Sequence, residues 1–380
     1  MLEQRLLEKA IGSPGRLISA EPFGDGRIAR LTVDDGPDAG EWFVDTSRQA
    51  VAKETGFVIR DGDGSTVARI WKHPLDPRLP ALRTALDPDR LRRIAEYGGS
   101  TTGPIEARVL SYRPGRRAVV RMTQHGRHMF VKVVRPAEAE ELAHIHQACR
   151  DAGVPAPRVA HWAPSGVLVV RDAAGIPGPL AAATVPPERI VDAVDALREQ
   201  LLGVRTHRIA RASVGTRLEW HIDRLAAALP GRERELHHLL ALLLPSIRRV
   251  GPPRVIHGDL HIGQLFFTDE SISGVIDVDT TGLGDPSDDA AAFIGHATAS
   301  AVRNETAGRA GDARILHALG EAAADRWIRD RHTAALASLH LVGHAIRAAE
   351  RNLEGANLML DEALDLQRLA PSVPEPQTKR

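Results

Sequence analysis

Short runs of alternating apolar and polar residues, separated by turn sequences such as Asp61-Gly62-Asp63-Gly64, fill the first part of the chain. Such runs predict β-strands. The predicted strands are Arg27–Val33, Glu41–Asp45, Gly56–Arg60 and Thr66–Trp71. A short amphipathic helix is predicted before them, and a second helix near Asp87–Tyr97. Residues 1–98 are therefore predicted to form a small β-rich N-terminal cap.

The pattern changes over residues 99–173, where a helix interrupts five predicted strands. The strands are Ala107–Tyr112, Ala118–Thr123, His128–Val134, Arg158–Trp162 and Gly166–Arg171. The helix is predicted over Ala137–Arg150, because Leu142, Ile145 and Cys149 follow helical spacing. This segment is predicted to be a second β-rich unit.

From residue 174 to residue 370 the spacing of Leu and Ala is helical, apart from one stretch. Short strands and tight turns are predicted between Arg254 and Ile276. The last ten residues, 371–380, contain three prolines and no apolar periodicity, and they are predicted to be a disordered tail. The whole pattern predicts an α+β fold in which a β-rich lobe precedes a helical lobe.

Composition excludes several functions. With 49 basic and 49 acidic residues the net charge is zero, so bulk attraction to nucleic acid is not expected. A single cysteine, Cys149, excludes an internal disulfide and any cysteine-based metal cluster. The N-terminus lacks the apolar core of a signal peptide, and the apolar run Leu239–Ile247 is too short to cross a bilayer. We expect a soluble, cytoplasmic protein with no membrane partner.

The densest group of polar residues lies beside short apolar strands. It falls within VIHGDLHIGQLFF (Val255–Phe267) and SGVIDVDTTGLGDPSDDAA (Ser273–Ala291). Polar groups in such a setting cost free energy unless they are paired or bind a ligand. Asp259 and Asp277, 18 residues apart, would suit a metal ion with bound phosphates.

These two segments carry a family resemblance. HGDLHIGQL resembles the catalytic loop of the aminoglycoside-phosphotransferase-like kinases, whose usual form is HGDxxxxN, and VIDVD with GDPSDDAA resembles their metal-binding segment. The resemblance extends over residues 105–350 and implies a bilobal protein-kinase-like fold. It also implies ATP-dependent transfer of a phosphoryl group to a hydroxyl of a small molecule, with ATP and Mg²⁺ as cofactors. The HGDLHxGQ form and the cap, by its position and strands, are further similar to the maltokinase and glucosamine kinase branch.

The resemblance assigns roles in the catalytic loop. Asp259 matches the catalytic aspartate that orients the acceptor hydroxyl and takes its proton. Asp277 matches the aspartate that holds Mg²⁺ on the nucleotide phosphates. Gln264 stands where most relatives have an asparagine as second metal ligand, and it offers the same carboxamide with one more methylene.

The nucleotide is expected to bind on the β-rich unit. Lys132, one of five lysines in an arginine-rich chain, matches the third-strand lysine that holds the α- and β-phosphates. Its partner is expected on the following helix, where Glu141 is preferred to Glu138 and His146 is a third option.

Two further segments of this unit are implied to contact the nucleotide. The turn Arg113–Arg117 is implied to overlie the triphosphate, with Arg116 or Arg117 adding positive charge. Adenine is implied to meet the backbone of Val169–Asp172.

The remaining polar residues have more than one interpretation. His257 is expected to orient the loop, and His261 to support the loop or contact substrate. Asp279 is a second metal ligand, a substrate contact or a solvated neighbour. Asp285 and Asp289 are expected to brace the loop, although Ser287-Asp288-Asp289 also has the pattern of a helix start.

The late helices offer few ligands. His340 and His344 have the i, i+4 spacing of a metal site but no matching carboxylate, so ordinary helical histidines are predicted. Acidic residues near the end lie among as many arginines and are predicted to form a solvated face rather than an aminoglycoside-binding wall. These acidic residues include Asp325, Asp330, Glu350 and Glu354.

The predicted function is a small-molecule kinase whose acceptor is a sugar or amino sugar. Aminoglycosides, other antibiotics and choline-like alcohols stay open as acceptors, as does GTP in place of ATP. Two alternatives belong to other classes. One is a catalytically silent relative that binds nucleotide. The other is a metal-dependent hydrolase that uses the His257-x-Asp259-x-His261 cluster.

Overall fold

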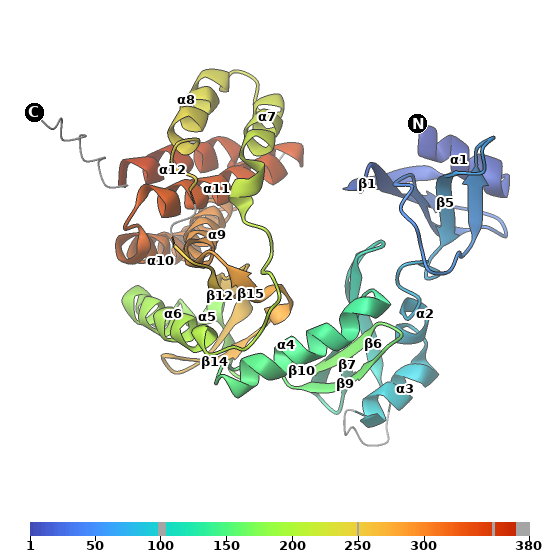
Figure 1. The fold of residues 1–380 in the computed structure, drawn as a ribbon, viewed down its shortest axis with the longest axis horizontal. Coiled ribbons are helices and arrows are strands. Elements are labelled where there is room, and N and C mark those ends of the chain that lie inside the picture. Colours follow the sequence, from blue (N-terminus) through green and yellow to red (C-terminus); the bar gives the residue numbers. More distant parts are fainter. Residues whose placement is uncertain (98–103, 249–250, 352–353, 370–380) are drawn as a thin grey trace, which may run out of the picture. The chain divides into compact units, whose positions relative to one another are not determined.

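The computed structural model describes residues 1–97, 104–248, 251–351 and 354–369 (Figure 1). The chain divides into two compact units. The first comprises Met1–His144 and Arg158–Asp172, and the second comprises Ile145–Pro157 and the chain from Ala173 onward. The first is β-rich and the second is helical, which confirms the predicted α+β class. The predicted tail, 371–380, lies outside the described residues.

The first unit begins with a five-stranded antiparallel sheet of order β1-β2-β3-β5-β4. Its strands are β1 (Arg16–Phe23), β2 (Gly26–Val33), β3 (Gly40–Asp45), β4 (Phe57–Arg60) and β5 (Thr66–Lys72). The helix α1 (Leu2–Ile11) packs on this sheet through Leu7, which is fully buried. The apolar pattern had predicted four of these strands. It missed β1, whose residues are almost all exposed and therefore show no alternation.

The second sheet of this unit is also antiparallel and has the order β6-β7-β8-β10-β9. Its strands are β6 (Glu106–Arg113), β7 (Arg117–Gln124), β8 (Arg127–Val133), β9 (Val159–Ala163) and β10 (Val167–Arg171). The helix α4 (Ala139–Asp151) follows β8 and leads into the second unit.

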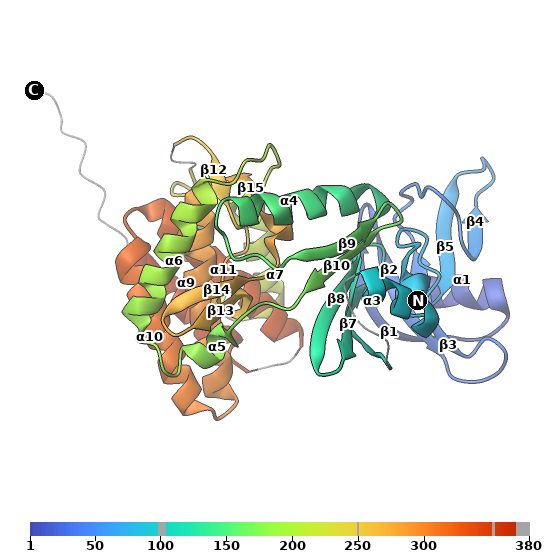
Figure 2. The same ribbon diagram turned by 90° about the horizontal axis from the view of Figure 1, so that it is seen from below.

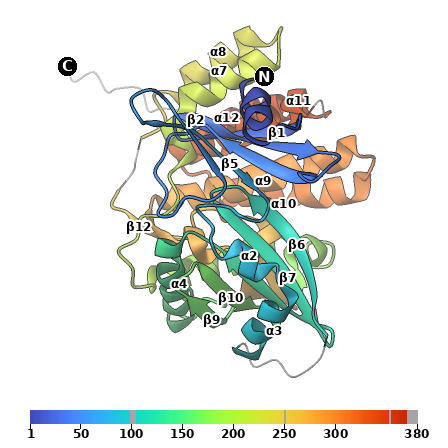
Figure 3. The ribbon, with the colours of Figure 1, turned by 90° about the vertical axis from the view of Figure 1, so that its right-hand side faces the viewer.

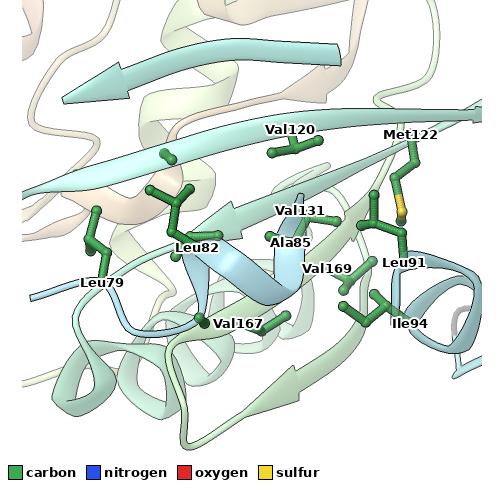
Figure 4. Close-up of a cluster of buried hydrophobic side chains, with 13 residues drawn as sticks. Leu79, Leu82, Ala85, Leu91, Ile94, Val120, Met122, Val131, Val167 and Val169 are labelled. Carbon is green, nitrogen blue, oxygen red and sulfur yellow. The ribbon is translucent and has the colours of Figure 1, made fainter. Parts of the chain in front are cut away.

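The helices α2 (Leu82–Ala85) and α3 (Pro88–Tyr97) lie against one face of this second sheet (Figure 3). Leu82 and Leu91 from these helices meet Val120 and Val169 from the strands in one buried cluster (Figure 4). The boundary predicted at residue 98 thus falls after two helices whose apolar side chains complete the core of the second sheet.

The helical unit is built around α9 (Pro286–Thr306), which packs against both α10 (Ala310–Trp327) and α11 (Arg331–Glu350) (Figure 1). Alanines fill much of this contact, because small side chains let helices approach closely. The other helices are α5 (Gly178–Ala181), α6 (Pro187–Leu202), α7 (Leu218–Ala228), α8 (Glu233–Leu243) and α12 (Ala356–Leu369). No helix among the described residues has the length and apolar character needed to cross a membrane.

Two small sheets interrupt the helices where short strands were predicted. In one, β12 (Arg254–Ile256) pairs with β15 (Gly282–Gly284). In the other, β13 (Leu265–Thr268) lies between β11 (Ile176–Pro177) and β14 (Ser271–Val275). Figure 2 shows β13 beside β14. These pairings bring the loop 257–264 beside the segment 276–281, and the Ile276 amide donates to the Gln264 carbonyl at 2.9 Å.

Candidate functional site

The loop after β12 is held by a carboxylate from the first turn of α9. Asp289 is 1% exposed, and its two oxygens accept hydrogen bonds from the backbone amides of His257 and Gly258, each at 2.8 Å. Gly258 has φ +82°, and a Cβ there would lie 2.6 Å from the Thr280 carbonyl oxygen. Only glycine therefore lets the loop pass this close to the segment 276–281. These contacts are those that a loop-bracing Asp289 requires.

His257 and Asp285 lie on either side of this clamp. His257 is fully buried, and its Nε2 donates to the Ile276 carbonyl at 3.0 Å, which ties the two segments together. Asp285 accepts from the Ser287 amide at 3.0 Å and so caps α9, and it also pairs with His332 Nε2 at 3.1 Å. His257 therefore orients the loop directly, whereas Asp285 fixes the start of α9, which carries Asp289.

Asp288, next to the clamp, is buried beside Ser213, whose hydroxyl donates to its carboxylate at 2.5 Å. Desolvation, opposed by that hydrogen bond, raises the pKa of Asp288 to about 6. An unfolded aspartate titrates near pH 3.9. Between these values the folded state therefore binds more protons than the unfolded state, and stability falls as the pH rises.

We expect Asp288→Asn to stabilise the protein by about 2–3 kcal/mol at pH 8 and to have almost no effect below pH 3.8. The asparagine oxygen can still accept from Ser213, so the substitution removes the charge and keeps the contact. Urea unfolding of both proteins from pH 3 to pH 8 measures the difference. Parallel stability curves over that range would contradict the prediction.

Asp259 lies in the loop with 23% of its side chain exposed. Arg211 Nη1 donates to Asp259 Oδ2 at 2.6 Å, and His296 Nε2 lies 4.0 Å from Asp259 Oδ1. The Arg211 amide donates to the Thr280 carbonyl at 3.2 Å, which fixes the arginine beside the loop. The sequence prediction missed Arg211, because no local pattern marks it in a chain where arginine is the usual cation.

Gln264 and Asp277, the predicted Mg²⁺ ligands, lie on the two neighbouring segments. Gln264 is 4% exposed, and its Oε1 has no hydrogen-bond partner in the described structure. Asp277 adopts the left-handed conformation with φ 58° and ψ 30°, which aspartate tolerates better than most residues. A buried carbonyl oxygen without a partner is costly, and Mg²⁺ prefers oxygen ligands. The residues present therefore fit the ion.

Asp279 has a partner in the same unit. His146 Nε2 lies 3.2 Å from Asp279 Oδ1, and His146 Nδ1 lies 3.0 Å from the Pro157 carbonyl oxygen. The end of α4 is thereby attached to the segment that carries Asp277. His146, which the sequence offered as a third possible partner for Lys132, is therefore bonded to Asp279 and Pro157.

The predicted nucleotide residues lie in the β-rich unit. Lys132 is 9% exposed on the central strand β8, opposite Val119 and Leu168. Glu141 is exposed in the first turn of α4. Glu138 receives hydrogen bonds from the side chain and the amide of Arg135, at 3.0 and 3.3 Å for Nε and N. Glu138 is thus engaged with Arg135.

The turn between β6 and β7 contacts the cap. Tyr112 Oη and the Gly115 amide both donate to Asp76 Oδ2, at 2.9 and 2.7 Å. Arg116 Nη2 donates to the Pro22 carbonyl at 2.9 Å, and its guanidinium lies 5.3 Å from the centre of the Phe23 ring. The cap therefore holds the turn that was predicted to cover the triphosphate, a contact that no sequence pattern indicated.

The strand β10 carries the predicted adenine contacts. The Val169 side chain is fully buried among the residues of Figure 4, so only its backbone could serve a ligand. Asp172 is exposed just after the strand ends.

Comparison with known proteins identifies the family. The model of the phosphotransferase enzyme family (APH) matches residues 112–339, which is more than half of the chain. The chain belongs to this family. The match includes Lys132, Asp259 and Asp277, and it favours phosphoryl transfer over the metal-dependent hydrolase that the sequence left open. No curated protein matches this phosphotransferase significantly.

Solved structures resemble the phosphotransferase in fold at low sequence identity. A thermostable mutant of aminoglycoside phosphotransferase APH(4)-Ia, solved with AMP-PNP and hygromycin B, is 12% identical, with a TM-score of 0.49 over 74% of this chain and 99% of that one. Macrolide 2'-phosphotransferase MphH from Brachybacterium faecium is 18% identical, with a TM-score of 0.42 over 75% and 100%. A putative aminoglycoside phosphotransferase from Ralstonia eutropha is 14% identical, with a TM-score of 0.42 over 73% and 94%.

Proposed function

We propose that this phosphotransferase transfers the γ-phosphoryl group of ATP to a hydroxyl of a small, sugar-type molecule. One observation carries the proposal. The Asp289 clamp fixes the loop of Asp259, and the bonds from the Ile276 amide to Gln264 and from His257 Nε2 to the Ile276 carbonyl hold that loop beside the segment of Asp277. Phosphoryl transfer depends on positioning and on charge neutralisation. This arrangement supports the positioning, and a metal ion held by Gln264 and Asp277 would supply the neutralisation.

In this proposal Asp259 accepts the proton of the acceptor hydroxyl. Arg211 holds the carboxylate through Oδ2 at 2.6 Å, so that Oδ1 faces the acceptor. The Asp289 clamp fixes the backbone beside it and keeps the carboxylate from drifting away from the reacting oxygen. A displacement of about 1 Å at such a site costs roughly 10²-fold in rate.

Gln264 Oε1 and the Asp277 carboxylate would hold Mg²⁺, which when bound neutralises charge on the phosphate oxygens. Lys132 would add a compact positive charge for the α- and β-phosphates, with Glu141 as its partner. The backbone of Val169–Asp172 would receive adenine.

The test is a coupled assay of ADP release by the full chain with ATP and Mg²⁺. The acceptors are neutral hexoses, amino sugars, sugar acids, aminoglycosides, macrolides and amino alcohols. We expect ADP release that requires one class of acceptor and stops when EDTA removes the metal. ATP binding without acceptor-dependent release from any class would instead favour the silent nucleotide-binding alternative.

Replacing Asp277 by Ala is expected to abolish the dependence of nucleotide binding on Mg²⁺. The substitution removes one of the two proposed metal ligands. Calorimetric titration with ATP, in Mg²⁺ and in EDTA, should give a clear affinity difference for the parent protein and none for the variant. Equal Mg²⁺ dependence in both would show that Asp277 does not hold the ion.

A further inference from the structure

Histidines and arginines surround Asp259 within the helical unit. We call this group the histidine–arginine face. It consists of Arg211, His261, His296, Arg303, His340 and His344. The rings of His261 and His296 stack with their centres 4.4 Å apart, and the ring of His296 lies 4.5 Å from that of His344 and 5.8 Å from that of His340. The i, i+4 spacing on α11 turns His340 and His344 together toward α9.

A chain of hydrogen bonds leads from Arg303 toward Asp259. Arg303 Nη1 lies 3.4 Å from His344 Nδ1, and His344 Nε2 lies 3.2 Å from His296 Nδ1. Arginine can only donate, so His344 Nδ1 accepts and its Nε2 carries the proton. The same reasoning places a proton on His296 Nε2, directed at Asp259 Oδ1 4.0 Å away. That separation exceeds a direct hydrogen bond.

The imidazoles of this face are neutral at physiological pH. Burial and the neighbouring cationic groups lower the pKa of His344 to about 3, and burial lowers the pKa of His340 to about 4. Burial, with the neighbouring histidines, also lowers the pKa of His296. Neutral rings add no charge to the face, and His296 Nε2 can donate to a hydroxyl placed beside Asp259.

The charged groups of the face are therefore mainly cationic. Arg211 is bonded to Asp259, whereas Arg303 is exposed and contacts the Ser300 hydroxyl and His344. Desolvation and the nearby Arg347 guanidinium lower the pKa of Arg303. An oxyanion that binds beside Arg303 would make charge-assisted hydrogen bonds with its guanidinium.

Two acidic side chains of α11 and its N-terminus are engaged in other contacts. Asp330 caps α11 through the Thr333 amide at 2.7 Å, and Glu350 pairs with Arg224 at 2.5 Å. A polyamine placed over the face would thus meet Arg303 and neutral histidines, and the Asp259 carboxylate is already bonded to Arg211. A cationic acceptor is disfavoured by this charge distribution.

We propose that the histidine–arginine face selects an acceptor that carries an oxyanion, a carboxylate or a phosphate, besides its reacting hydroxyl, and that it rejects polyamines. This inference rests on the proposed kinase function and narrows its acceptor class. The hydroxyl would lie beside Asp259 within reach of His296 Nε2, and Arg303 would receive the oxyanion.

The test compares matched hexose derivatives as acceptors: glucose, glucosamine, glucuronate and glucose 1-phosphate, with hygromycin B as the polyamine. We expect kcat/KM to be highest for glucuronate or for glucose 1-phosphate. Comparison of these two compounds shows whether the face prefers a carboxylate or a phosphate. Arg303→Glu should lower that kcat/KM roughly tenfold, because attraction becomes repulsion. Arg314→Glu, the same change at an exposed arginine of α10, should leave it unchanged. Preference for glucosamine or hygromycin B would overturn the inference.

A second measurement separates failure of this inference from failure of the kinase assignment. The unfolding midpoint of the full chain, without nucleotide, is measured with each of the five compounds. Stabilisation by an anionic sugar in the parent protein, absent in Arg303→Glu, supports the inference even if no ADP is released. Stabilisation by glucosamine or hygromycin B alone, or by no compound, overturns it, whatever the ADP assay shows.

Discussion

Asp259→Asn is expected to lower kcat by roughly 10²–10⁴-fold, the usual contribution of a positioned general base. Asparagine has almost the same shape as aspartate. Its side-chain oxygen can still accept a hydrogen bond from Arg211 Nη1, which lies 2.6 Å from Asp259 Oδ2 in the parent protein. It cannot take up the proton of the acceptor hydroxyl. The loop should therefore keep its structure while transfer fails, and ATP should bind with nearly unchanged affinity.

The measurement is acceptor-dependent ADP release together with calorimetric ATP binding. Asp269→Asn is the matched control, because Asp269 is exposed in the turn between β13 and β14 and has φ 54°, a conformation that asparagine adopts readily. The control should retain full activity. If Asp259→Asn turned over at the rate of the parent protein, the catalytic loop would have been assigned wrongly.

The fold could be predicted from the sequence wherever one side of an element is buried. In β7 buried and partly buried residues alternate, and β10 is almost continuously apolar. Both strands contribute to the core of the second sheet, so their sequence patterns are easy to recognise. β1 was missed because it lies at the edge of its sheet and is exposed on nearly every residue. An edge strand supported mainly by backbone pairing has no side-chain pattern to detect.

The candidate site likewise contains residues that the sequence could indicate and residues that it could not. Asp259, Gln264, Asp277 and Asp289 lie in the two motifs that resemble the family, so the sequence could indicate them. Arg211 and His296 come to Asp259 from the segment after α6 and from the middle of α9. Their positions depend on how the helices pack, and no local pattern records that packing.

The cap illustrates a second limit. Asp76 is buried and accepts hydrogen bonds from Tyr112 and Gly115, which are far from it in sequence. Its pattern in the sequence is that of an ordinary turn aspartate between prolines. Only the tertiary structure shows that the predicted phosphate-covering turn is attached to the N-terminal sheet.

Asp289→Ala is expected to cost about 3–5 kcal/mol of unfolding free energy, because it leaves two buried backbone amides without acceptors. Hydrogen bonds to charged groups contribute about 1.5–3 kcal/mol each. Desolvation raises the pKa of Asp289, so burying its charge offsets part of this gain. The loss of unfolding free energy should therefore lie near the lower end of about 3–5 kcal/mol.

The loss is measured by urea unfolding, with Asp288→Asn as the adjacent control. The two substitutions should act in opposite directions at pH 8, because Asp288 is a buried charge with one hydroxyl partner and Asp289 holds two amides of the catalytic loop. The unfolding free energy of Asp289→Asn should lie between those of the other two variants. The asparagine oxygen can accept from one loop amide, but its NH₂ group faces the other amide. Asp289→Ala with unchanged stability would mean that the loop keeps its conformation without the clamp, and the positioning of Asp259 would then need another cause.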